Sequence, residues 1–394
     1  MRNIIITGGG MVNKGAQAMT MIAVHELRRR FPQHRIYLYS PVDLANKSLD
    51  KTVFNFDFTG WYPLKFAHCQ HNVLLRAVTL LRNRKELLEA EALYRNTDFI
   101  VDISGYALGS NWRAKICNDY LDILEFAQAF DIPVYLMPQS FGPFDFGTEH
   151  PGVDARCRKL LPGCKAILAR EQEGYEALVN TYGLRNVRLA PDLVLNNKGI
   201  DLANVFKQIP EIELPEILPD SIAVVPNGRN LSVGNDKGVL ELYCTAIACG
   251  LKQGKTVYIM HHSTVDADLC TQLKAQFADK ANVILLEQEF SCLEFNELVQ
   301  KFDYLLASRF HSIVHAYKNG IPCVILGWAK KYEDLSALFD QRHYLFDVRS
   351  DVDGDSLCTA MDRMNVRRDE ESQRIKAHLS DVQTENVFDV LGNQ

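Results

Sequence analysis

The chain has 394 residues, a formal net charge of −6, an apolar fraction of 47% and a charged fraction of 23%. This length indicates two domains, because single hydrophobic cores stop growing beyond about 250–300 residues. The net negative charge argues against a nucleic-acid binder that works through overall basicity, and no apolar run approaches the roughly 18 residues of a membrane-spanning helix.

The N-terminus predicts a strand at residues 3–7, because its short apolar run leads directly into the glycine loop GGGMVNKG and not into a signal-peptide cleavage site. The loop matches neither the dinucleotide-binding nor the P-loop pattern. Its glycines allow a ligand to approach the backbone closely, with Asn13 and Lys14 as polar contacts. A tight turn without a ligand is the alternative.

Helices and strands then alternate through the first half of the chain. We predict helices at residues 14–31, 66–94, 119–130 and one ending near 182, and strands at 35–39, 98–103, 132–137, 165–169 and 188–190. The helix at 66–94 is locally basic and apolar on one side. Such a helix either packs on its own domain or lies on an anionic membrane surface.

Polar residues follow the predicted strands of this half. They are Asn13, Asp102, Ser104, Gln139, Ser140, Arg170 and Asp192. Each alone is typical of a turn or a helix cap. Because the carboxyl ends of parallel strands meet at one edge of a sheet, the set indicates the wall of a ligand cleft.

The ten cysteines contain no CxxC pair. Several lie within predicted strands or helices, which indicates reduced, buried thiols in a cytoplasmic protein.

The proline-rich, acidic segment at 199–220 predicts a linker between an N-terminal domain, residues 1–198, and a C-terminal domain, residues 221–394, whose last helices could pack back on the first domain. In the second domain, strands at 221–225, 256–260 and 283–286 alternate with helices near 239–253, 266–279 and 292–301. The residues Asn227, Arg229, His261 and His262 follow these strands.

The stretch 303–334 predicts a strand at 304–307, a helix at about 309–319 and a strand at 321–326. We expect Ser308 to cap the helix, with Arg309 and His311 beside its positive end, which describes a site for a small anion with an acid–base residue in reach. The alternatives are a structural cap, an ion-paired arginine and a structural histidine. His315 lies one turn after His311, but the HExxH pattern is missing, so we expect no metal.

Several segments resemble the polysaccharide pyruvyltransferase family. They are TGGGMVNKGAQAM, DISGYALGSNW, MPQSFGPF, LAREQEGYEAL, APDLVL, VVPNGR, ASRFHSIVHAYKNGIPCV and KKYEDL, in family order over most of residues 3–340. The segment SRFH is similar to the most specific family signature, whereas SGYALG departs from the glycine triplet of many members.

The resemblance implies two Rossmann-like α/β domains that face each other across a cleft, as in glycosyltransferase-B enzymes. It implies transfer of a pyruvyl group from phosphoenolpyruvate to a sugar of a glycan or polysaccharide precursor, with a ketal formed and phosphate released. It also implies that Arg309, His311 and the backbone near Phe310 hold phosphoenolpyruvate, with Arg229 as a second arginine on its anionic groups. Paired guanidinium groups suit that donor, which carries a phosphate and a carboxylate.

The mechanism implied for the family needs an acid that protonates the methylene carbon of phosphoenolpyruvate. Imidazole titrates near neutral pH, so His311 is the candidate acid. Asp102 or Asp192 is the candidate base for the sugar hydroxyl. No step requires a cofactor beyond the co-substrate phosphoenolpyruvate.

Two other functions fit the same layout. One is a nucleotide-sugar glycosyltransferase or epimerase, although the second domain shows no acidic residue clearly placed for a ribose. The other is a carbohydrate-binding protein without catalysis. The resemblance further implies a cytoplasmic protein that works on a free or lipid-linked glycan acceptor, with peripheral contact at the inner membrane face through the basic helix.

Overall fold

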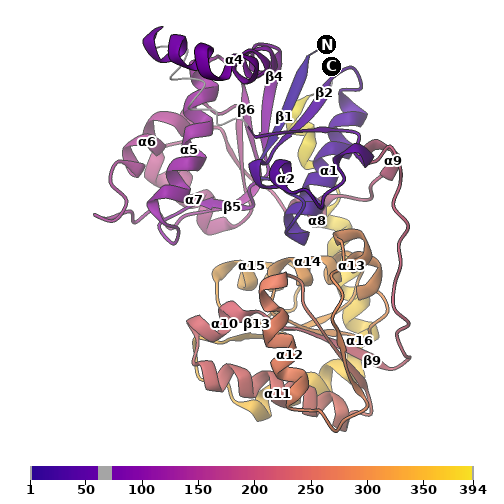
Figure 1. The fold of residues 1–394 in the computed structure, drawn as a ribbon. Coiled ribbons are helices and arrows are strands. Elements are labelled where there is room, and N and C mark those ends of the chain that lie inside the picture. The colour runs from indigo at the N-terminus through magenta and orange to yellow at the C-terminus, as the bar shows by residue number, and fades with distance from the viewer. Residues whose placement is uncertain (1, 61–72, 393–394) are drawn as a thin grey trace. The chain divides into compact units, whose positions relative to one another are not determined.

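The computed structural model describes residues 2–60 and 73–392 (Figure 1). The chain forms two compact units. The first contains the residues up to 193, residues 197–210 and the C-terminal residues from 385 onward, and the second contains residues 194–196 and 211–384. No helix within the described ranges has both the length and the apolar character needed to cross a membrane.

The first unit is built on a parallel sheet in the order β3-β2-β1-β4-β6-β7-β8, with β5 paired to the end of β6. Its strands are β1 (Asn3–Thr7), β2 (Arg35–Tyr39), β3 (Asp57–Thr59), β4 (Thr97–Asp102), β5 (Tyr106–Leu108), β6 (Val134–Phe141), β7 (Ala166–Ala169) and β8 (Val187–Leu189). Its helices are α1 (Lys14–Arg30), α2 (Pro41–Ala45), α4 (Val73–Arg95), α5 (Ala114–Ala129), α6 (Val153–Leu160), α7 (Gln172–Tyr182) and α9 (Leu202–Val205), with 3-10 turns at Lys51–Val53, Leu161–Gly163 and Val387–Leu391.

Both faces of this sheet are covered. Buried residues of α4, α5 and α6 form one core with strand residues such as Ile5, Ile100 and Leu136. Helix α1 buries Met19, Ile22 and neighbouring residues on the other face (Figure 1). Strand β1 is buried along its whole length, because it lies in the middle of the sheet with its apolar side chains against both helix layers.

The second unit has a parallel sheet in the order β11-β10-β9-β12-β13-β14. Its strands are β9 (Ser221–Val225), β10 (Thr256–Met260), β11 (Val283–Leu286), β12 (Leu305–Ala307), β13 (Cys323–Gly327) and β14 (Leu345–Asp347). Its helices are α10 (Gly228–Val233), α11 (Asp236–Lys252), α12 (Ala267–Ala275), α13 (Cys292–Val299), α14 (Phe310–Lys318), α15 (Lys330–Leu338) and α16 (Gly354–Val382), with 3-10 turns at Thr264–Asp266 and Arg342–Tyr344. The short helix α8 (Leu193–Asn196) begins at the border between the units.

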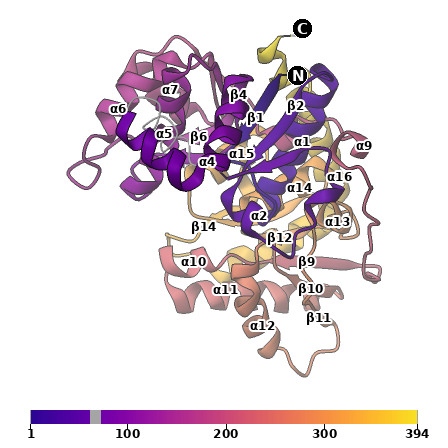
Figure 2. The same cartoon turned by 45° about the horizontal axis from the view of Figure 1, so that its top comes forward.

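This second sheet is also covered on both faces. Helices α11, α12 and the first part of α16 share a core with one face of the strands. Helices α13 and α14 lie on the opposite face, as Figure 1 and the turned view of Figure 2 show. The fold is therefore the expected α/β architecture of two parallel-sheet domains.

Five predicted strands, β1, β2, β9, β10 and β11, have the expected bounds. Two predictions in the first unit were wrong in detail. Helix α5 begins at Ala114, five residues earlier than expected, and β6 continues through Gln139 and Ser140, which we expected in a loop. The extension follows from pairing, because β5 bonds to the end of β6 with Tyr106 opposite Ser140 and Leu108 opposite Phe141.

The expectation of reduced cysteines is wrong at one pair. Cys249 of α11 and Cys358 of α16 form a disulfide with their Cα atoms 5.9 Å apart. They are separated by 109 residues in sequence and meet because the two helices pack together, so their spacing carried no signal. The other described cysteines are free thiols, mostly buried, and Cys69 lies outside the described residues.

The predicted basic helix at 66–94 corresponds to α4, and its first residues lie outside the described ranges. Within α4, Val78 and Leu88 are about half exposed, whereas Ala90 and Tyr94 are buried against the sheet. The C-terminal part of the helix therefore packs on its own unit.

Candidate functional site

The two sheets each contain a point at which the order of strands reverses. In the second unit this point lies between β9 and β12, because β10 follows β9 on one side and β12 lies on the other. Ligands of open α/β sheets bind beyond the carboxyl ends of the strands at such points. Arg229 and Arg309 follow β9 and β12 closely: Arg229 is the second residue of α10, and Arg309 comes directly before α14.

The loop after β12 is held by buried hydrogen bonds to Ser308. This residue is fully buried. The Tyr243 hydroxyl donates to its Oγ at 2.9 Å, and its carbonyl accepts from Asn227 Nδ2 at 3.1 Å and from the Tyr332 hydroxyl at 3.0 Å. The predicted cap was wrong: Arg309 is the N-cap of α14, without a side-chain cap bond, because the Ser308 side chain points into the unit.

Arg309 makes a bidentate ion pair. Its Nε donates to Asp266 Oδ2 at 2.6 Å and its Nη2 donates to Asp266 Oδ1 at 2.7 Å. The Arg309 side chain is 25% exposed and the Asp266 side chain is 0% exposed. Among the described residues, no hydrogen bond involves Nη1 of Arg309. The alternative of an ion-paired arginine is therefore confirmed, and one edge of the guanidinium stays available to a ligand.

His311 occupies the first turn of α14 and is partly exposed. Its ring lies edge-on to Phe310, with ring centroids 5.5 Å apart. Lys331, from the first turn of α15, places its Nζ 5.2 Å from the Phe310 ring and 5.6 Å from the Tyr332 ring. The KKYEDL motif contains this lysine, but the sequence alone did not indicate that it lies over the SRFH segment.

Arg229 stands in the first turn of α10, after Asn227, whose side chain caps that helix. It is exposed, donates to the Ser232 hydroxyl at 3.3 Å and lies 5.8 Å from the Trp328 ring. The loops after β9, β12 and β13 thus each bring one cation, Arg229, Arg309 and Lys331, to the carboxyl edge. Helices α14 and α15 begin at the same edge without a side-chain cap, and the backbone N–H groups of such a helix start favour anions. At the start of α10, by contrast, the Gly228 and Arg229 N–H groups donate to Asp266 and Asn227.

His261 and His262 lie at the expected end of β10 but are buried. The His262 ring is edge-on to Phe295 of α13 at 4.8 Å and 6.2 Å from the His315 ring. His262 and His315 therefore belong to the packing between α13 and α14. In the ranges that the structure describes, no group of three or more His, Cys, Asp or Glu residues could hold a metal ion.

In the first unit, Asp102 lies at the reversal point between β1 and β4 and is buried. Its Oδ2 accepts from the Thr7 hydroxyl at 2.7 Å and the Ser104 hydroxyl at 2.9 Å, and its Oδ1 accepts from Gln139 Nε2 at 3.0 Å and the Ser104 N–H at 3.2 Å. Burial raises the pKa of Asp102, against the effect of these hydrogen bonds. Tyr120 extends the network by donating to Gln139 at 3.2 Å.

A second buried network joins Ser140 to charged residues. Arg170 donates to the Ser140 hydroxyl at 2.5 Å, to Glu171 at 2.8 Å and to Asp192 at 2.9 Å, and the Ser140 hydroxyl donates to Glu171 at 2.8 Å. Burial would lower the pKa of Arg170, but the two carboxylates raise it. The structure thus brings the predicted residues Ser140, Arg170 and Asp192 together, and Glu171 completes their set.

The glycine loop after β1 is shaped by its own chain. Gly8 has φ +73°, and a Cβ there would lie 2.1 Å from Ser104 Oγ. The Asn13 side chain accepts from the Gly15 and Ala16 N–H groups and caps α1, and Lys14 is buried. Close packing of the backbone against the β4 loop therefore accounts for Gly8 without a ligand.

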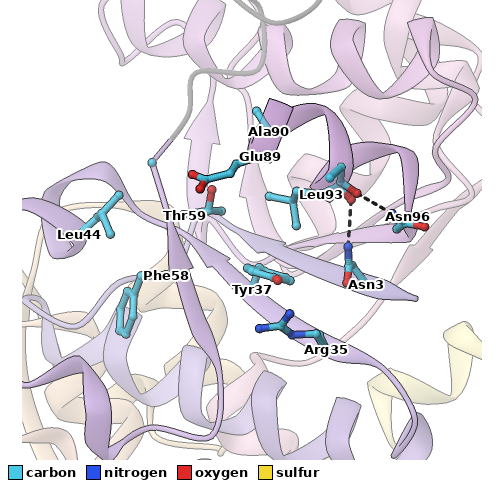
Figure 3. Close-up of a pocket in the computed structure, with 12 residues that line it drawn as sticks. Asn3, Arg35, Tyr37, Leu44, Phe58, Thr59, Glu89, Ala90, Leu93 and Asn96 are labelled. Atoms are coloured by element: carbon cyan, nitrogen blue, oxygen red, sulfur yellow. Dashed lines mark hydrogen bonds between the residues drawn. The ribbon is translucent and has the colours of Figure 1, made fainter. Parts of the chain in front are cut away.

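A cavity of about 760 Å³ lies under α4 on the first sheet (Figure 3). It is lined by residues that include Tyr37, Phe58, Glu89 and Leu93, which come from β2, β3 and α4. None of its lining residues is a predicted site residue. The carboxyl edges of the sheets, and not this cavity, hold the candidate site residues.

Comparison with known proteins gives one family and a set of similar folds. The family model for polysaccharide pyruvyl transferase matches residues 13–330. A search of curated proteins finds no significant match.

Three solved structures illustrate the similarity of fold. UDP-GlcNAc 2-epimerase from Methanocaldococcus jannaschii has a TM-score of 0.53 and 13% identity, over 96% of this chain and 99% of that chain. UDP-GlcNAc 2-epimerase from Neisseria meningitidis has a TM-score of 0.56 and 13% identity, over 99% and 96%. UGT71G1 from Medicago truncatula, solved with UDP-glucose, has a TM-score of 0.54 and 10% identity, over 99% and 96%. At these identities the likeness shows the fold alone, which is that of glycosyltransferase-B enzymes and related epimerases.

Proposed function

Because this chain belongs to the polysaccharide pyruvyl transferase family, we propose that it transfers a pyruvyl group from phosphoenolpyruvate to a sugar of a polysaccharide or glycan precursor. The sugar receives the group as a ketal, and phosphate is released. The observation that carries the choice of donor is the carboxyl edge of the second sheet. There Arg229, Arg309 and Lys331 stand beside three helix starts, and His311 is the neighbouring imidazole.

This edge suits a small ligand with two anionic groups. A guanidinium binds a phosphate or a carboxylate with fixed orientation, and backbone N–H groups at a helix start add further donors. We therefore assign the second unit to phosphoenolpyruvate and the first unit to the glycan acceptor. The networks around Asp102 and Arg170 order the carboxyl edge of the first unit.

The proposed reaction begins with protonation of the methylene carbon of phosphoenolpyruvate by His311. The neighbouring carbon becomes oxocarbenium-like, and a sugar hydroxyl attacks it. The carbon–oxygen bond to phosphate then breaks, and a second hydroxyl closes the ketal. The two hydroxyls release two protons, of which one restores the imidazolium and the other leaves with phosphate.

The base for the sugar hydroxyl stays a prediction. Asp102 already accepts hydrogen bonds at both carboxylate oxygens, and Asp192 accepts from Arg170. Neither the donor nor these residues calls for a cofactor in the proposed reaction. We further propose that the protein acts in the cytoplasm on a free or lipid-linked glycan, with α4 as the segment for contact with the inner face of the membrane.

The test is phosphate release from phosphoenolpyruvate with a panel of glycan acceptors, for the native chain and for Arg309→Ala and His311→Ala. We expect release that depends on an acceptor and on both residues. For His311→Ala we expect kcat to fall by about 10²- to 10⁴-fold, as for loss of a general acid, with a smaller change in KM for phosphoenolpyruvate.

The same panel separates the other functions. Protection from thermal unfolding by a nucleotide sugar, without protection by phosphoenolpyruvate, would replace this proposal by a nucleotide-sugar enzyme. Binding of glycans without any phosphate release would indicate a carbohydrate-binding protein.

A further inference from the structure

We propose that Asp266 is a positioning residue that orients Arg309 toward the donor and ties the start of α10 to the start of α14. The inference rests on the proposed use of phosphoenolpyruvate at this edge. Asp266 ends the 3-10 turn Thr264–Asp266 after β10. It belongs to no sequence motif, and its distance along the chain from Arg309 gave no sign that the two residues pair.

The contacts of Asp266 reach two neighbouring loops. Both of its oxygens accept from the Arg309 guanidinium, at 2.6 and 2.7 Å, and Oδ1 also accepts from the Gly228 N–H at 2.9 Å. Gly228 is the first residue of α10 and precedes Arg229. One carboxylate therefore sets the distance between the start of α10 and the start of α14, on either side of the strand reversal.

The geometry of the ion pair determines what Arg309 can offer to a ligand. A bidentate pair fixes the plane of the guanidinium, and Nε and Nη2 face the carboxylate. Nη1 is the nitrogen left for the donor. Because the charges of Arg309 and Asp266 largely cancel, Arg309 mainly provides a hydrogen-bond donor of fixed orientation. Arg229 and Lys331 supply most of the net positive charge at this edge.

This arrangement explains why lysine should not replace Arg309. An ammonium group is a point charge without a planar fork, so it cannot hold Asp266 at two atoms and present a third nitrogen in a fixed direction. We expect Arg309→Lys to raise KM for phosphoenolpyruvate nearly as much as Arg309→Ala does.

The first experiment compares Asp266→Asn with Asp268→Asn, an exposed carboxylate two residues along the chain. We expect Asp266→Asn to raise KM for phosphoenolpyruvate by about 10- to 100-fold, the range for loss of a hydrogen bond to a charged group. The change in kcat should be smaller. Asp268→Asn should stay within about twofold of the native chain, because an exposed residue without these contacts has no such role.

The second experiment asks whether Asp266 acts through Arg309. Binding of phosphoenolpyruvate is measured by calorimetry for the native chain, both single variants and Asp266→Asn combined with Arg309→Ala. We expect Asp266→Asn to weaken binding in the native background and to change it by less than about twofold when Arg309 is absent. An equal loss in both backgrounds would overturn the inference, as would an unchanged KM for Asp266→Asn.

Two controls distinguish failure of this inference from misfolding of the variant and from failure of the proposed function. If Asp266→Asn does not fold, Asp266→Glu keeps the charge and displaces the carboxylate by one methylene, and an unchanged KM for that variant would overturn the inference. If the native chain neither binds nor turns over phosphoenolpyruvate, the proposed function fails. If the native chain turns over phosphoenolpyruvate and the Asp266 variants have the same KM as the native chain, only the inference about Asp266 fails.

Discussion

Tyr243→Phe removes one hydroxyl from the centre of the second unit and leaves the ring in place. The hydroxyl donates to Ser308 at 2.9 Å and accepts from the Asn227 N–H at 3.1 Å and from Asn230 Nδ2 at 3.3 Å. These groups are buried, and burial raises the pKa of Tyr243 to about 12. The variant therefore leaves buried donors without an acceptor.

The expected loss of stability follows from these contacts. A net hydrogen bond contributes about 0.5–1.5 kcal/mol, and a buried group left unsatisfied costs about 1–3 kcal/mol. We expect Tyr243→Phe to lower the free energy of unfolding of the second unit by about 2–3 kcal/mol, or its Tm by about 4–12 °C. KM for phosphoenolpyruvate should rise as well, because Ser308 and Asn227 precede the two arginine-bearing helices.

Tyr317→Phe is the matched control. Tyr317 is also fully buried in the second unit, but among the described residues its hydroxyl has no hydrogen-bond partner. Removal of that hydroxyl should be neutral or stabilising. Urea unfolding of both variants measures the difference, and equal stabilities for Tyr243→Phe and Tyr317→Phe would show that the hydrogen bonds of Tyr243 do not stabilise the second unit.

Three further predictions concern other parts of the molecule. Gly8→Ala should destabilise the first unit by more than about 2 kcal/mol in urea unfolding, because a Cβ there clashes with Ser104 and alanine also disfavours the left-handed backbone. Gly183→Ala is the control: Gly183 has φ +66° and open space around it, so the change should cost only about 1–2 kcal/mol. Because burial raises the pKa of Asp102, the folded state keeps the carboxyl proton at a pH where the unfolded chain has lost it. The stabilisation from this proton is full below the ordinary pKa of 3.8 and is lost as the pH rises through the folded pKa. The free energy of unfolding of Asp102→Asn, relative to that of the native chain, should therefore increase from pH about 4 to pH about 7. The same difference between variant and native chain at both pH values would contradict this prediction. Arg229→Ala should change the stability by less than about 0.5 kcal/mol, because the side chain is exposed, and should raise KM for phosphoenolpyruvate by about tenfold in the phosphate-release assay; an unchanged KM would remove Arg229 from the donor site.

Much of the fold could be predicted because its signals are local. Buried parallel strands appear as short apolar runs, and polar or glycine residues end them, which is why β1, β9 and β10 have the expected bounds. The alternation of strands and helices also predicted that the candidate residues lie at the carboxyl edge of each sheet. Arg229 and Arg309 stand at strand ends that the sequence already located.

The partners of the candidate residues could not be predicted in this way. Asp266 pairs with Arg309 from a different loop, and Tyr243 holds Ser308 from a helix on one face of the sheet. The disulfide between Cys249 and Cys358 depends on two helices that meet only in the folded unit. The expected helix cap at Ser308 failed for the same reason, since its buried environment offered the hydroxyl another partner.

The order of helices and strands, the two parallel sheets and the sheet edges that carry the candidate residues could be predicted from the sequence, since these depend on hydrophobic period and on breaks between elements. Packing in three dimensions shows which nitrogen of Arg309 lies outside its ion pair, that Lys331 lies over Phe310, and that Asp102 accepts hydrogen bonds at both carboxylate oxygens. These features depend on contacts between residues far apart in the chain, which packing selects and local patterns do not encode.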